Sequence, residues 1–204
     1  EVVRRFGRID AVVNNASVFE YDNAETCGLA AMELHWKANT APAILLAQAL
    51  YQHLLDTGRT GCVVNLLDQK LWNPNPDYFS YTLSKAALES AVRYMAYDLG
   101  PKGIRVFAVS PGPIMTRAAS GIANFNTLLE NDAEKAPLGR TVTIDEVGAL
   151  TAFLCTSGSS GMTGQTIYVD AGAHIVASGA LYGGSHNLLH YTLRRFGIET
   201  TFVP

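Results

Sequence analysis

The sequence predicts an α/β fold in which helices cover both faces of a parallel β-sheet. Short apolar segments typical of buried strands alternate with longer segments whose apolar residues recur at helical spacing. Parallel strands need helical crossovers, and strands buried on both faces are apolar throughout. No repeat or linker divides residues 1–172, and a 48% hydrophobic content in 204 residues is enough for one substantial core.

Each expected element follows from a local pattern. A strand followed by a loop is expected over residues 10–17, and further strands are expected over 61–68, 104–112 and 164–172. A helix is expected over 29–55 with Gly58 as its C-cap, and another from Asp77, its N-cap, to Leu99. Residues 115–135 indicate a loop and a short helix. A helix over 143–155 has Thr143 as N-cap and Glu146 three residues later, which is a capping box.

The composition limits the kinds of partner that are expected. A formal net charge of −3 offers no basic surface for nucleic acid or an anionic membrane, so small molecules or other subunits are expected as partners. The three cysteines, Cys27, Cys62 and Cys155, are widely spaced and odd in number, which favours a reducing cytoplasm over a disulfide framework. No apolar run is long enough to span a membrane, and "EVVRRFGRID" has neither an initiator Met nor a signal-peptide core.

The residues that follow the strands are the candidate ligand-binding residues, because ligands bind at the carboxyl ends of the strands in open parallel sheets. Three such sets are Asn14–Ser17, Leu67–Gln69 and Ser110–Thr116.

A tyrosine and a lysine near the start of the helix after the second strand form a fourth set. Lys85 lies about 40° round a helix from Tyr81, so the two share a face. An ammonium beside a phenol favours the phenolate and lowers its pKa toward the working range of a general acid. From spacing alone, the pair is more often an ordinary half-exposed one. Tyr78, seven residues before Lys85, would also share this face, because seven residues fall about 20° short of two turns.

Several segments in order, VVNNAS, GCVVNLLDQ, YTLSKAALE, GIRVFAVSPGPIMT and GMTGQTIYVDAG, resemble the short-chain dehydrogenase/reductase family over residues 1–175. The resemblance implies a Rossmann-like doubly wound parallel sheet and NADP or NAD as the cofactor. It implies that Tyr81 is the general acid, that Lys85 holds the nicotinamide ribose and lowers the pKa of the tyrosine, and that Asn39 orders a water of a proton relay. The remaining cofactor-binding residues that it implies are Asn14, Ala16, Ser17, Pro111, Gly112, Ile114 and Thr116.

Asp68 departs from the family pattern, which has a serine about thirteen residues before the tyrosine. With the NNAS segment, it resembles the pteridine-reductase branch, in which an aspartate assists proton delivery to a ring nitrogen. This implies hydride transfer to a C=O or C=N bond. The alternative is a strand-end carboxylate that binds backbone N–H groups.

The second half, residues 91–177, resembles the bacterial enoyl-acyl-carrier-protein reductases of fatty acid synthesis, which reduce a C=C bond. Their tyrosine and lysine are seven residues apart, which would make Tyr78 the proton donor instead of Tyr81. In that branch, the segment matching residues 118–125 is part of a mobile lid, and the alternative is an ordinary surface helix.

The family's glycine-rich loop, TGxxxGxG, is absent before Asn14, so the resemblance implies a sheet that lacks its first strands. A further alternative is therefore an inactive fragment or chimera that keeps only the dimerisation helices. The family's dimer interface matches helices 29–55 and 78–99, which predicts a homodimer or homotetramer.

The last segment, residues 176–204, does not resemble the reductases and predicts a helix and strand tail of unrelated origin after a domain of residues 1–175. It resembles the homoserine sulfhydrylase type of pyridoxal-phosphate enzyme, in which the residue matching Tyr182 stacks on the cofactor. The Schiff-base lysine is missing, so we expect no such activity. His186 and His190 are four residues apart, but without the Glu of an H-E-x-x-H motif no metal is expected.

Overall fold

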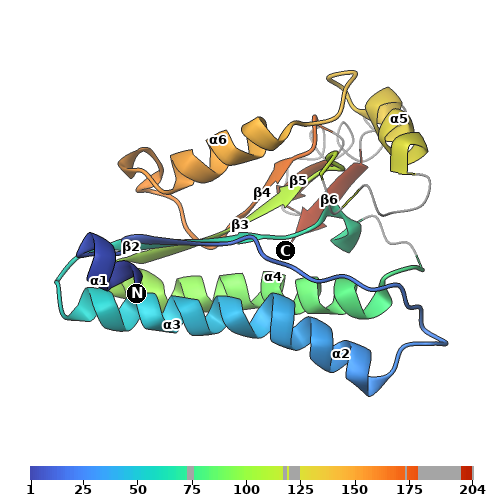
Figure 1. Ribbon diagram of the computed structural model, residues 1–204. Coiled ribbons are helices and arrows are strands. Elements are labelled where there is room, and N and C mark those ends of the chain that lie inside the picture. Colours follow the sequence, from blue (N-terminus) through green and yellow to red (C-terminus); the bar gives the residue numbers. More distant parts are fainter. Residues whose placement is uncertain (73–75, 117–118, 120–124, 173, 179–198, 204) are drawn as a thin grey trace. The chain divides into compact units, whose positions relative to one another are not determined.

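The computed structural model describes residues 1–72, 76–116, 119, 125–172, 174–178 and 199–203 (Figure 1). These residues form two compact units, the first made of residues 1–109 and 149–167 and the second of residues 110–148 and 168–204. Each unit is described on its own.

A four-stranded sheet runs in the order β1-β2-β3-β4. Its strands are β1 (Ala11–Asn14), β2 (Gly61–Leu66), β3 (Ile104–Pro111) and β4 (Thr166–Val169). β1 pairs with β2 and β2 with β3 in parallel, so that Val12, Val63 and Val106 lie side by side across three strands. The prediction of a parallel sheet with helical crossovers is confirmed.

Helices α3 (Ala41–Leu55) and α4 (Phe79–Leu99) lie side by side along the sheet (Figure 1). Val63 and Val106 pack with Leu50 and Leu88 of these helices in the main core cluster. Because strand side chains alternate between faces, Cys62 belongs to the opposite face, where its thiol contacts the Leu154 carbonyl at 3.4 Å. Leu154 ends α6 (Ile144–Leu154), so the sheet of the first unit is covered on both faces.

The predicted helix over residues 29–55 is confirmed, but it is not a regular α-helix throughout. α2 (Leu29–His35) is followed by a π-helical segment, η1 (Trp36–Thr40), before α3 begins. The apolar spacing continues across this break, because a π turn adds one residue without ending the helix. α3 ends at Leu55 with Asp56 as its C-cap, so Gly58 lies beyond the cap, with φ +63°.

The predicted N-cap of α4 is also wrong. The cap is Tyr78, with φ 61° in the left-handed region, and its side chain makes no capping hydrogen bond. The Asp22 carboxylate supplies this contact from far along the chain, accepting from the Ser80 N–H at 3.0 Å. α4 ends before Gly100, as predicted.

The second unit contains α5 (Phe125–Lys135), the first part of α6, and the two parallel strands β5 (His174–Ser178) and β6 (Glu199–Val203). The predicted capping box is confirmed, because Thr143 N donates to Glu146 Oε2 at 2.9 Å and Glu146 N donates to Thr143 Oγ1 at 3.2 Å. The predicted domain boundary at residue 175 falls inside β5 and stays a prediction. The expected tail helix, Tyr182, His186 and His190 lie outside the described residues, as does most of the expected lid.

The remaining short helices are α1 (Val2–Phe6), η2 (Gln69–Leu71), η3 (Gly100–Lys102) and η5 (Ser157–Ser159). η5 overlaps the start of a glycine-rich segment, GSSGMTG over residues 158–164, which leads through a turn toward β4.

Candidate functional site

The site is built where β2 ends and α4 begins. Asp68 comes two residues after β2 and opens the short helix η2, where its Oδ1 accepts from Lys70 N at 2.9 Å. This is the backbone-binding role that was the alternative for Asp68, and it occupies only one carboxylate oxygen. The other, Oδ2, accepts a hydrogen bond from the Tyr81 hydroxyl at 2.8 Å.

Tyr81 and Lys85 lie on the inner side of α4, one turn apart, and both are buried, with 8% and 4% of their surfaces exposed. The Lys85 ammonium lies 5.8 Å from the centre of the Tyr81 ring. It donates to the Leu66 carbonyl at the end of β2, at 2.8 Å. An ordinary half-exposed helix pair is therefore excluded.

The acid–base balance of the pair differs from the expectation. Burial raises the pKa of Tyr81 above the ordinary value, and the negative charge of Asp68 raises it further. A hydrogen bond with Ser17 lowers this pKa, but by less. We had expected Lys85 to lower the pKa of Tyr81. Burial lowers the pKa of Lys85 to about 8, and the charge of Asp68 offsets part of this. The expectation overlooked the hydrogen bond between the phenol and the aspartate.

Tyr78 lies outside α4, so the helical rotation used to place it beside Lys85 does not apply. Its ring makes edge contacts with Phe19 and Tyr21, each at 5.8 Å between ring centres. The cation over its ring is Lys70, at 4.9 Å. The structure therefore pairs Tyr81 with Lys85 and Tyr78 with Lys70.

Asn39 lies in the π segment and is 4% exposed. Its side-chain oxygen accepts from Ser17 Oγ at 3.0 Å and from Val18 N at 2.8 Å. Its side-chain nitrogen donates to the Val18 carbonyl and to Ser84 Oγ, each at 2.9 Å. Both amide hydrogens are used, so the side chain joins the loop after β1 to α4.

The expected cofactor-binding residues of the first unit lie at and after the end of β1. Asn14 ends the strand and donates to Asn65 of β2 at 2.8 Å, while Ala16 and Ser17 are exposed. These residues share the Asn39 network with Tyr81, because Ser17 contacts both.

In the second unit, Pro111 ends β3, and the N–H of Gly112 donates to the Val169 carbonyl at 2.8 Å. Ile114 packs against the small apolar cluster of Ala136, Val142 and Ala171. The Thr116 hydroxyl accepts from the Ala119 N–H at 3.1 Å. The Ser110 hydroxyl is fully buried, and no described residue forms a hydrogen bond with it.

Sequence reasoning missed several buried polar side chains of the first unit: Asp22, His35, Asn65, Ser80 and Ser84. For Ser80, the sequence did contain a signal: it lies in the first turn of α4, three residues after the predicted cap Asp77. A helix whose preceding residue cannot cap it needs an acceptor from elsewhere in the chain.

Two further observations concern only the described part of the chain. Within it, no helix is long and apolar enough to cross a bilayer. Over the same residues, no group of three or more His, Cys, Asp or Glu side chains could hold a metal ion.

A parallel α/β sheet with a tyrosine and a lysine one turn apart, on the helix after a buried strand, defines the class of short-chain dehydrogenases/reductases. The family described as Enoyl-(Acyl carrier protein) reductase matches residues 1–174, and the chain belongs to it.

Curated relatives match about half of the chain. It is 54% identical over 106 residues to the NADH-dependent enoyl-[acyl-carrier-protein] reductase FabI of Haemophilus influenzae, which is 52% of this chain and 40% of that protein. It is 50% identical over 94 residues to the NADPH-dependent FabI of Staphylococcus aureus, which is 46% of this chain and 37% of that protein. The matches therefore span less than half the length of these relatives.

Solved structures match more of the chain. FolM alternative dihydrofolate reductase 1 from Brucella canis, complexed with NADP, is 35% identical with a TM-score of 0.70, over 83% of this chain and 64% of that one. The Bacillus cereus enoyl-acyl carrier protein reductase, with NADP+ and indole naphthyridinone, is 30% identical with a TM-score of 0.78, over 84% and 67%.

Proposed function

We propose that the protein is an NAD(P)H-dependent reductase in which Tyr81 supplies the proton for reduction of a C=O or C=N bond in a pteridine-like substrate. The observation that carries the proposal is the 2.8 Å hydrogen bond from Tyr81 to Asp68, with Lys85 held against the same ring. The likeness to a dihydrofolate reductase over 83% of the chain supports this substrate class.

Lys85 gives the structural reason to expect a dinucleotide here. Its buried ammonium has three donor hydrogens, and the acceptor the described residues offer is the Leu66 carbonyl. The hydroxyls of a ribose would supply acceptors for the other hydrogens of the Lys85 ammonium. The other residues assigned to the cofactor are Asn14, Ala16, Ser17, Pro111, Gly112, Ile114 and Thr116. When bound, the nicotinamide would supply a hydride.

The proton comes from the chain itself. With its pKa raised, Tyr81 holds its proton at neutral pH and is loaded as an acid. Giving it up would leave a buried phenolate beside the Asp68 carboxylate, which is unfavourable unless a positive charge is near or Asp68 carries a proton. Lys85 is placed to offset that charge and, with its pKa lowered to about 8, can also release a proton.

Asn39 has a different role from the expected one in this scheme. Both hydrogens of its side-chain amide bind the protein, so we assign it to holding Ser17 and Val18 in place and not to ordering a water through that amide.

The second candidate is reduction of the C=C bond of an enoyl thioester. The 54% identity to an enoyl reductase over half of the chain favours it. In this case Tyr78 would be the proton donor, because its ring lies at the same aromatic cluster, sharing Phe19 with Tyr81.

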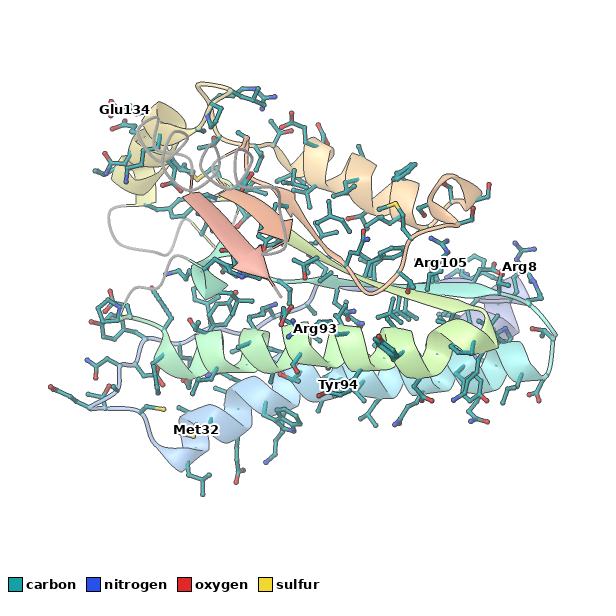
Figure 2. The ribbon with its side chains drawn as sticks, turned by 180° about the vertical axis from the view of Figure 1, so that it is seen from behind. Arg8, Met32, Arg93, Tyr94, Arg105 and Glu134 are labelled. Atoms are coloured by element: carbon teal, nitrogen blue, oxygen red, sulfur yellow. The ribbon has the colours of Figure 1, made fainter. Side chains whose placement is uncertain are left out.

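Self-association is proposed for the helical face. Large apolar side chains on α2, η1, α3 and α4 are exposed, namely Leu29, Met32, Trp36, Leu45, Leu46, Leu83, Tyr94 and Tyr97. Met32 and Tyr94 are labelled in Figure 2 on α2 and α4. Exposed apolar surface of this extent marks an interface, so we propose a cytoplasmic homodimer or homotetramer formed through helices 29–55 and 78–99.

Cofactor binding tests the proposal first. The chain is titrated with NADPH and with NADH, following cofactor fluorescence, alongside Lys85→Met and the exposed control Lys37→Met. Saturable binding that Lys85→Met abolishes and Lys37→Met keeps is expected. Turnover is then measured with dihydrofolate and with crotonyl-coenzyme A, which separate the two substrate classes. A folded sample that binds neither cofactor would make the chain an inactive fragment or chimera.

A further inference from the structure

A second polar cluster lies beside Tyr81, away from Asp68 and Lys85. It consists of Asp22, in the loop after β1, His35, at the end of α2, and Ser80, in the first turn of α4. All three are buried, with exposed fractions of 6%, 0% and 1%. The proposed proton transfer does not use them.

The hydrogen bonds of this cluster run in one direction. The Glu20 N–H donates to His35 Nε2 at 3.1 Å, so this nitrogen carries the lone pair. In a neutral imidazole the proton is then on Nδ1, which lies 2.8 Å from Ser80 Oγ. The Ser80 hydroxyl donates to Asp22 Oδ2 at 2.5 Å.

This order excludes nucleophilic use of the serine. A nucleophilic serine donates its proton to the histidine, and the carboxylate orients the far ring nitrogen. Here the histidine donates to the serine, the serine donates to the carboxylate, and the hydroxyl is buried.

The cluster instead holds the first turn of α4. Tyr78, the N-cap, offers no side-chain acceptor to that turn, and Asp22 accepts from both the N–H and the hydroxyl of Ser80. Burial raises the pKa of Asp22, but the two bonds from Ser80, a hydrogen bond from Cys27 and, least of all, the charge of His35 together outweigh it, so the pKa lies below the ordinary value.

Tyr81 is the next residue along the helix. Its ring packs edge-on against the His35 ring, with 6.2 Å between ring centres. The cluster thus fixes both the backbone that carries the phenol and one side of its ring.

We propose that Asp22, Ser80 and His35 form a positioning device for Tyr81, which fixes the phenol toward Asp68 and requires His35 to be neutral with its proton on Nδ1. The expected effect of the cluster on the reaction rate rests on the proposed function. The tautomer of His35 and the environment of the Tyr81 phenol do not depend on it.

The first test is nitrogen NMR of His35 in the full chain without cofactor, assigned with His35→Asn. A protonated Nδ1 and an unprotonated Nε2 are expected at neutral pH. A protonated Nε2 or a doubly protonated ring would overturn the inference.

The second test compares Ser80→Ala with Ser90→Ala, a control in a half-buried position further along α4. In Ser80→Ala, the second-derivative ultraviolet absorbance of Tyr81, assigned with Tyr81→Phe, should shift toward that of a solvent-exposed tyrosine, because the loosened turn admits water. It should stay unchanged in Ser90→Ala. An unchanged spectrum in a folded Ser80→Ala protein would count against a positioning role, whether or not the wild type turns over.

If the wild type is active, the rates add a third test. His35→Leu should lower kcat about 10- to 100-fold with KM nearly unchanged, since a misplaced catalytic group costs rate. His35→Asn keeps a donor where Nδ1 lies and should recover most of kcat. Equal losses in the two folded variants would assign His35 to packing alone.

Discussion

The Tyr81 hydroxyl donates to the Asp68 carboxylate at 2.8 Å, and both groups lie beside the end of β2. This bond places a negative charge next to the residue proposed to release a proton. The chemistry of the site is therefore set by how that charge is balanced, and Lys85 is the cation held against the ring.

Removing the charge of the Asp68 carboxylate should lower the pKa of Tyr81. In Asp68→Asn we expect the pKa of Tyr81 to fall, because the charge of Asp68 is its second largest cause. It should remain above the ordinary value, since burial, the largest cause, is unchanged. Tyrosinate absorbance measures the shift, and Asp98→Asn, an exposed site on α4, is the control. A pKa that does not move would show that the carboxylate charge does not act on the phenol.

The two tyrosines separate the two proposed reactions. Tyr81→Phe should lower kcat at least about 100-fold, the loss typical of a missing general acid, and circular dichroism should show an intact fold. Tyr78→Phe should keep kcat within about threefold. Steady-state rates with dihydrofolate and crotonyl-coenzyme A provide the measurement. The reverse ranking would assign proton donation to Tyr78 and favour the enoyl reaction.

Lys85 should destabilise the folded state. A buried ammonium with its pKa lowered from 10.5 to about 8 destabilises the folded state at neutral pH, so Lys85→Met should raise the free energy of unfolding by about 1–3 kcal/mol. Denaturant unfolding at pH 7 measures this, with Lys37→Met as the exposed control. A loss of stability in Lys85→Met would mean that the bond to Leu66 outweighs the cost of burial.

The same residue gives a pH dependence with a defined sign. Between about pH 8 and 10.5 the unfolded lysine holds its proton and the folded one has released it. The unfolded state then binds more protons, so this group makes the free energy of unfolding rise with pH in that window. Subtracting the Lys85→Met curve from that of the wild type isolates the rise, and a flat difference would contradict the lowered pKa.

In the second unit, the capping box gives a local prediction. Thr143→Ala removes the acceptor for Glu146 N and should cost about 1 kcal/mol of unfolding free energy. Thermal unfolding compares it with Thr141→Ala, whose side chain is not part of the box. Equal melting temperatures for the two variants would show that α6 does not depend on the box.

The sequence was sufficient to predict those elements that depend on neighbouring residues in the chain. β2 and β3 are apolar because both faces are covered, and Thr143 and Glu146 meet within one helical turn. The Tyr81 and Lys85 pair was found by helical spacing together with family resemblance. Their shared burial gives the pair its chemistry, and spacing alone does not specify burial.

The parts that were missed depend on contacts between distant residues. Ser80 meets Asp22 across 58 positions and His35 across 45, and no local pattern encodes such a meeting. The pKa of Tyr81 was assigned the wrong direction for a related reason. The distance from Asp68 to the phenol depends on how the chain leaves β2, and helical periodicity says nothing about that path.

The π segment at Trp36–Thr40 sets the phase between two helices. If these residues were wound as a regular α-helix instead, α2 would be rotated by roughly 100° about its axis relative to α3, because a π turn holds one residue more than an α turn. His35 would then point away from Ser80. The wider turn therefore keeps the far end of the site aligned, and we expect the insertion of a further residue in this segment to be tolerated far less than its exposed tryptophan suggests.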